Sequence, residues 1–316
     1  MFTAKVTNYF GKGNQRTDYP DGGWSWNILY LEVSKYKIRL IQDRDVIGNK
    51  IKAKGMIYTT DVEIDGVTKY EEGVRVVNDL CRILSFASFS QVVPFSYSFD
   101  GYSRRISISA EAMNFRPLIH IKDGKATQKY VEQVWSKYRK EKRTRKLGEV
   151  IEMLTISELP VQPLEVKLAQ IFIILENLKT TYARSKKIPF KNGFFRKLSS
   201  PPKPNLKKEK KYSFNDLLNL MFSEVGMKPN LKKIANLRNE IIHFGLSRKP
   251  YQSLSTDYEF CHDIVREYLL RFLQYEGKYK LYSSAARITK QLTSCTRVTT
   301  ASRGHHNRAS ARSRRP

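Results

Sequence analysis

Alternating apolar and polar residues dominate the first third of the chain. This period of two is typical of strands that bury one face, and turn-forming residues separate the segments. The predicted strands are WSWNILYLEV (24–33), KIRLIQ (37–42), KAKGMIYTTDVEI (52–64), GVTKYEEG (66–73) and VVPFSYSFDGYSRRISIS (92–109). The Asp100-Gly101 pair predicts a hairpin turn within the last of these segments.

The spacing of apolar residues becomes helical once within the strand-rich part and then throughout the later part of the chain. Apolar residues spaced by three and four predict a helix over 73–88, and they are Val74, Val77, Leu80, Cys81 and Leu84. From Ala126 onward the period stays helical, which predicts one or two helices over 126–157 and a long one over 163–187. The long helix has a core stripe of Leu168, Ile171, Leu175 and Leu178.

The later helices carry capping signals. Ser213 with Asp216 marks the start of one helix, and Gly245 marks the end of the next. Thr256 and Glu259 have the spacing of a capping box for the last helix. The predicted fold class is therefore α+β, with a mixed sheet-and-helix domain over 1–125, an all-α bundle over 126–282 and a disordered basic tail over 283–316.

Charge narrows the choice of partner. The chain has 57 Lys and Arg against 30 Asp and Glu, a net charge of +27, which favours an anionic partner and above all nucleic acid. A membrane surface is the weaker alternative, because no basic helix has a clean apolar face and the longest apolar stretch, 169–178, is too short to span a bilayer. The N-terminus lacks a signal peptide and the three cysteines form no framework, so we expect a cytoplasmic protein without a membrane partner.

The excess charge is concentrated in the segments 137–146, 184–211 and 283–316. In the second, an expected exposed loop, phenylalanines alternate with cations, an arrangement that can stack bases and neutralise phosphates. The candidate nucleic-acid contacts are Lys191, Arg196, Lys197, Lys207 and Lys208. The alternative is that Phe190, Phe194 and Phe195 only attach the loop to the bundle.

The sequence LRNEIIHFG (237–245) holds the candidate chemistry. Its helix would bury a stripe of Ile234, Leu237, Ile241 and Phe244. Asn239 and His243 are four residues apart and share another face, and the long side chain of Arg238 can reach it from the border of the stripe. The ordinary alternative is a capped core helix with a structural histidine, in which Arg238 pairs with Glu176 or Glu240.

This arrangement resembles the motif of HEPN ribonucleases, an Arg followed by a polar residue and then by His at R-x(4–6)-H spacing. The order of an α+β half and a helical half resembles ApeA-type abortive-infection proteins. The resemblance implies that Arg238, Asn239 and His243 are catalytic, that two copies pair through the helical domain, and that no metal or cofactor is needed. It further implies cleavage of tRNA or bulk RNA in anti-phage defence, with the N-terminal domain restraining the nuclease or sensing a phage-derived trigger.

The residue types suit RNA cleavage by the 2′-hydroxyl. Histidine transfers protons near neutral pH, and arginine presents a permanently charged fork to phosphate oxygens. The chain has no HExxH motif and no carboxylates at metal-binding spacing, and His120 and His262 are interpreted as structural, the former in a strand. A non-catalytic module that binds nucleic acid or a partner, and a general binder that depends on the basic tail, remain the alternatives.

Overall fold

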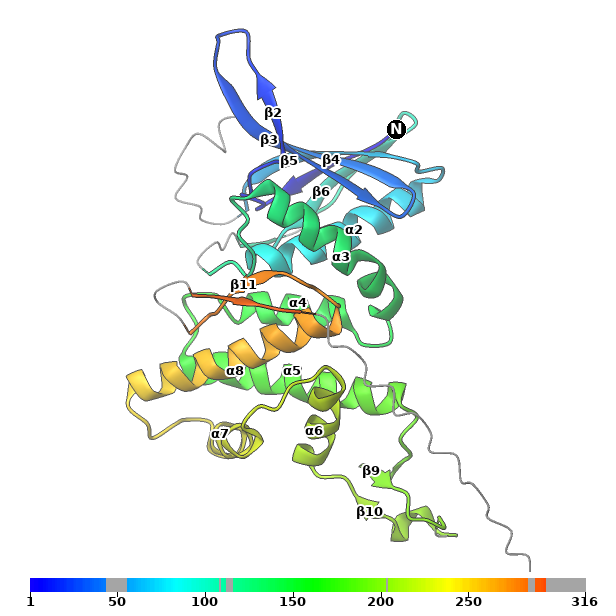
Figure 1. Ribbon diagram of the computed structural model, residues 1–316, viewed down its shortest axis with the longest axis vertical. Helices are drawn as coiled ribbons and strands as arrows, with labels where there is room; N and C mark the ends of the chain where they lie inside the picture. Colours follow the sequence, from blue (N-terminus) through cyan, green and yellow to red (C-terminus); the bar gives the residue numbers. More distant parts are fainter. Residues whose placement is uncertain (44–55, 108, 112–115, 203, 284–287, 294–316) are drawn as a thin grey trace, which may run out of the picture.

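The computed structural model describes residues 1–43, 56–107, 109–111, 116–202, 204–283 and 288–293 (Figure 1). The large sheet lies in the first half of the chain. A seven-stranded antiparallel sheet has the order β2-β3-β4-β5-β1-β6-β7. These strands are β1 (Phe2–Thr7), β2 (Gln15–Asp18), β3 (Trp24–Val33), β4 (Tyr36–Gln42), β5 (Tyr58–Asp65), β6 (Val93–Phe99) and β7 (Tyr102–Arg105).

The sheet follows the alternating pattern of the sequence. In β4, residues with buried and with solvent-facing side chains alternate, as expected when one face of an antiparallel sheet is covered. The predicted hairpin is confirmed, because Phe99 pairs with Tyr102 and both turn residues, Asp100 and Gly101, have positive φ. The strand predicted over 66–73 is wrong, since α2 (Tyr70–Ser88) already begins there; residues 52–55 of the preceding prediction lie outside the described part of the chain.

Two helices cover the buried face of the sheet. The helix predicted over 73–88 is confirmed as α2, which packs on β1 and β6. α3 (Gly124–Glu141) packs beside it on β3, and its N-cap Asp123 accepts backbone hydrogen bonds from Lys125 and Ala126. Figure 1 shows both helices between the sheet and the rest of the molecule, so they connect the sheet to the helical half.

The helical half contains α4 (Leu147–Ile156), α5 (Leu164–Ser185), α6 (Phe214–Glu224), α7 (Leu231–Phe244) and α8 (Tyr251–Phe272). The four predicted core residues of α5 are all buried, and Ser213 is the predicted N-cap of α6, where it also forms a capping box with Asp216. The capping box predicted at Thr256 is wrong, because α8 starts five residues earlier after Pro250 and Thr256 donates a hydrogen bond to the Gln252 carbonyl within the helix.

Short strands make this half mixed and not all-α. β8 (Phe190–Lys191), β9 (Phe194–Lys197) and β10 (Lys210–Lys211) form a small sheet where an open loop was predicted. β11 (Lys278–Lys280) pairs with β12 (Thr289–Gln291), so disorder was the wrong expectation for this part of the tail. Leu292 is buried in the core next to β12, and the Lys290 ammonium lies 2.7 Å from Glu267 on α8, so both contacts attach this segment. The tail residues 284–287 and 294–316 lie outside the described residues.

One continuous core runs from the sheet through α2 and α3 to α5 and α8. The basic segment 137–146 borders this core, and several of its cations are paired there. Lys142 and Arg139 contact the buried carboxylate of Asp79, and the buried Arg145 donates hydrogen bonds to the Tyr268 hydroxyl and the Leu178 carbonyl. This segment therefore uses much of its charge to hold the two halves together, because buried charges require such partners.

His262 on α8 is completely buried where the halves meet. Its ring packs against Phe89, Tyr258 and Tyr282, and its Nε2 atom lies 3.1 Å from Oε1 of the buried Glu158. Burial lowers the pKa of His262, although the neighbouring Glu158 carboxylate acts in the opposite direction. The structural interpretation of this histidine agrees with its surroundings.

We predict that stability decreases with falling pH through His262. The unfolded histidine takes up a proton near its ordinary pKa of 6.5, whereas the folded one resists it, so acid favours the unfolded chain. Denaturant unfolding at about pH 7.5 and about pH 5.5 should show a smaller loss of unfolding free energy in His262→Gln than in the wild type. An equal loss in both proteins would contradict the prediction.

Candidate functional site

α7 presents the predicted motif at its end. The helix begins after Asn230, whose side chain accepts a hydrogen bond from the Lys233 amide, and it ends at the predicted Gly245 with φ 74°. Ile234, Leu237 and Ile241 are buried as expected, but Phe244 is 78% exposed, so its predicted place in the stripe is wrong. Every residue from Ile242 to Leu246 is exposed, because the last turn projects beyond the core.

Arg238 is anchored to α5. Its Nε and Nη2 atoms lie 3.1 Å and 3.0 Å from Oε1 of Glu176, one of the two partners expected from the sequence. The guanidinium also stacks on Phe214, 4.9 Å from the ring centre. The other expected partner, Glu240, instead contacts Ser247 and Lys249. Arg238 is nevertheless 26% exposed, so its outer edge remains accessible to solvent.

The structure joins Arg238 to Asn239 but not to His243. Nη1 of Arg238 donates a hydrogen bond of 3.3 Å to Oδ1 of Asn239. His243 lies one helical turn further along the Asn239 face and is exposed. Within the described part of the chain, the His243 side chain has no hydrogen-bond or ion-pair partner, so its ring is available for another molecule.

Sequence reasoning missed two neighbours of this site. Lys179 contacts the second oxygen of Glu176 at 2.5 Å, and its ammonium lies 5.1 Å from the ring centre of Phe214. The three-residue spacing of Glu176 and Lys179 was a usable signal, but the contribution of Phe214 from α6 required the tertiary structure. The Glu176 carboxylate thus contacts both Arg238 and Lys179, and the three side chains together keep a net positive charge.

Large apolar side chains surround His243 in the sequence and are exposed. We call them the α7-end patch: Ile242, Phe244, Leu246 and Tyr251, with exposed fractions of 45%, 78%, 71% and 74%. Single exposed apolar residues are common on protein surfaces, whereas four within ten residues of the sequence make this end of α7 a candidate interaction surface.

The basic insert between α5 and α6 is more ordered than expected. Phe195 is buried with Ala183 and Leu217, and the neighbouring Arg196 is buried as well. The Arg196 guanidinium donates hydrogen bonds to the carbonyls of Lys191, Lys207 and Glu209, which hold β8, β9 and the 3₁₀ turn η1 (Leu206–Lys208) together. Its placement makes Arg196 a structural residue and removes it from the candidate nucleic-acid contacts.

The other candidate contacts of the insert stay at the surface. Lys191, Lys197, Lys207 and Lys208 are exposed, and so are Phe190 and Phe194 at 56% and 45%. Lys211 lies over the Phe194 ring, 3.8 Å from its centre. Each of the two interpretations of the phenylalanines therefore applies to different residues. Phe195 attaches the insert to the bundle, whereas the rings of Phe190 and Phe194 are partly exposed to solvent.

The remaining candidates stay apart from this site. His120 is exposed and lies outside any strand, contrary to the expectation of a strand position. Among the residues that the structure describes, no cluster of His, Cys, Asp and Glu could hold a metal ion, and no helix is long and apolar enough to cross a bilayer. Comparisons with known protein families, with curated proteins and with solved structures found no match.

We predict that Arg196→Ala loosens the insert, because three carbonyls lose a charged donor. Limited digestion with chymotrypsin should cut near Phe190 and Phe194 about tenfold faster than in the wild type, as local opening becomes easier. Lys197→Ala is the matched control, since this side chain is exposed on the same strand. Equal digestion of both variants would show that Arg196 does not hold the insert.

Proposed function

We propose that the protein is a metal-independent endoribonuclease of HEPN type that acts as a homodimer. The observation that carries the proposal is an exposed His243, without a side-chain partner among the residues that the structure describes, one helical turn from the hydrogen-bonded Arg238–Asn239 pair. The helical half would correspond to the HEPN bundle. A cytoplasmic role in anti-phage defence, with the N-terminal half responding to a phage-derived trigger, rests on the resemblance of the sequence to ApeA-type proteins.

The chemistry uses the nucleophile that RNA itself supplies. A base removes the proton of the 2′-hydroxyl, the 2′-oxygen bonds to phosphorus, and the bond from phosphorus to the 5′-oxygen breaks as that oxygen receives a proton. The products end in a 2′,3′-cyclic phosphate and a 5′-hydroxyl. His243 is suited to the proton transfers, and Arg238 to the negative charge on the phosphorane.

Arg238 can serve both its ion pair and a phosphate. Two of its nitrogens meet Glu176, whereas Nη1 lies on the side of Asn239 and His243. Because Lys179 shares Glu176, the carboxylate does not cancel the positive charge of the pair. The ion pair and the stacking on Phe214 would hold the guanidinium in place before RNA arrives, which lowers the cost of reorganisation.

A second copy of the chain would complete the site. One exposed histidine cannot easily act as both base and acid in the same cleavage, but two copies would supply two. The α7-end patch offers an apolar surface for that contact, since it surrounds His243 in the sequence. The exposed lysines of the basic insert and the rings of Phe190 and Phe194 would bind flanking RNA, either tRNA or bulk RNA.

A module that binds RNA without cutting it is the alternative. The Arg238–Glu176 ion pair favours it, because this contact alone accounts for an arginine at this position of α7. In that case the exposed lysines would give salt-dependent binding with no product. The two functions differ in one observable, the appearance of cleaved RNA with cyclic phosphate ends.

We predict cleavage of tRNA or bulk RNA in the presence of EDTA. Arg238→Ala and His243→Ala should each reduce the rate by about 10²-fold or more, because each removes a group that acts in the transition state. His120→Ala and Arg248→Ala are the matched controls, as both residues are exposed and lie outside the motif.

Circular dichroism and unfolding midpoints must show that all four variants are folded. Full activity in both motif variants would refute the site. Binding without any product in the wild type would support the alternative function.

We predict that Phe244→Glu separates the dimer, because it places a charge in the α7-end patch. Light scattering should show a dimer for the wild type and a monomer for the variant, together with loss of cleavage. Trp24→Glu is the control, since Trp24 is 56% exposed on the sheet, away from α7. A wild-type monomer that cleaves RNA would contradict the two-copy site.

A further inference from the structure

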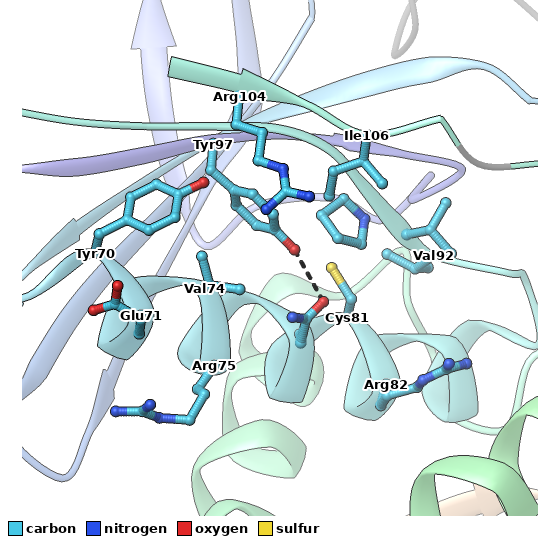
Figure 2. A pocket seen from close by; sticks show the side chains of 13 residues that line it. Tyr70, Glu71, Val74, Arg75, Cys81, Arg82, Val92, Tyr97, Arg104 and Ile106 are labelled. Carbon is cyan, nitrogen blue, oxygen red and sulfur yellow. Dashed lines mark hydrogen bonds between the residues drawn. The ribbon is translucent and has the colours of Figure 1, made fainter. Parts of the chain in front are cut away.

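A pocket lies between α2 and the β6–β7 hairpin, far from α7 (Figure 1, Figure 2). Its volume of about 590 Å³ falls within the range of sites that hold small organic molecules. The apolar wall consists of Tyr70, Val74, Cys81, Val92, Pro94 and Ile106. The pocket opens to solvent between a helix and the edge of the sheet, so a small molecule could enter it.

Neutral polar groups face the interior of this pocket. The Tyr97 hydroxyl donates a hydrogen bond of 3.0 Å to Oδ1 of Asn78, which leaves the Asn78 amide group able to donate (Figure 2). Burial raises the pKa of the Cys81 thiol to about 12, so this group stays uncharged at neutral pH. The inner part of the pocket therefore carries hydrogen-bonding capacity without charge.

One arginine lies at the mouth of the pocket. Arg104 reaches over it from β7, on the side of Tyr97 and Ile106, whereas the side chain of Arg75 points away from the pocket on the other side of α2 (Figure 2). Arg82, also on α2, is neutralised by Glu152 at 2.7 Å. In the described part of the chain, Arg104 has no carboxylate partner, and Glu71 is the single acidic residue of the lining.

This combination defines the chemistry of a ligand. Guanidinium groups bind carboxylates, sulfonates and phosphates through paired hydrogen bonds, and they bind them more strongly beside a surface of low polarity. A neutral apolar molecule would leave Arg104 unused, and a cation would be repelled by it. A bare inorganic anion would leave the apolar wall empty.

We propose that this pocket binds a small organic anion, whose apolar body lies between α2 and the hairpin and whose acidic group is held by Arg104. The site does not depend on the ribonuclease proposal, because it shares no residue with α7. The proposal assigns ligand binding to the N-terminal half, because the residues that line the pocket belong to α2, β6, β7 and the segments beside them.

Two dyes with the same rings test the proposal on the full chain. Anilinonaphthalene sulfonate carries an acidic group, and N-phenylnaphthylamine lacks it. Fluorescence titration should show saturable binding of the sulfonate that Val74→Trp abolishes, because the indole fills the pocket. Arg104→Gln should weaken the sulfonate about tenfold and leave the neutral dye unchanged.

Arg105→Gln is the matched control, because Arg105 is the next residue on β7 and points to the opposite face of the sheet. Ile106→Trp fills the pocket from the hairpin side and replaces Val74→Trp if that variant does not fold. The proposal is overturned if sulfonate binding survives the filled pocket, or if Arg104→Gln and Arg105→Gln affect it equally. Equal affinity of the wild type for both dyes would also overturn it.

Discussion

The structure depends on the contacts that stabilise polar side chains of α8 in their buried positions between the two halves. Arg266 and His262 are both fully buried on this helix. Arg266 donates one hydrogen bond to the Arg116 carbonyl at 3.2 Å and stacks on Phe89, so residues of the N-terminal half supply these two contacts of its guanidinium. Removing the N-terminal half would take these contacts away from a buried charge, which is costly. Polar contacts of buried side chains therefore hold the two halves together, in addition to the buried apolar surface.

This constraint also determines where the candidate site lies. α8 packs against α5, and α5 in turn supports α7 through the buried stripe and the Arg238–Glu176 ion pair. The first turns of α7 are thereby fixed, while its last turn extends past the support. A rigid helix with an exposed end can hold Arg238 and Asn239 in position and still offer His243 to another molecule.

The high positive charge of the chain does not have one purpose. Arg145 and Arg196 are buried and hold elements together, and Lys290 fixes β12 to α8. The exposed lysines of the basic insert remain at the surface, and Arg104 lies at the pocket between α2 and the β6–β7 hairpin. Net charge predicted an anionic partner, but it did not distinguish these different positions.

Local patterns in the sequence determined most of the elements and the motif. Alternation predicted the sheet, spacings of three and four predicted α2 and α5, and the capping residues Ser213 and Gly245 were assigned correctly. The spacing of Asn239 and His243 fixed their common face, because helical geometry is local. The exposure of Phe244, the burial of Arg196 and the pocket under Arg104 were decided by the tertiary structure. Each depends on whether a segment distant in the sequence covers the residue, and the local spacing of apolar residues carries no information about that.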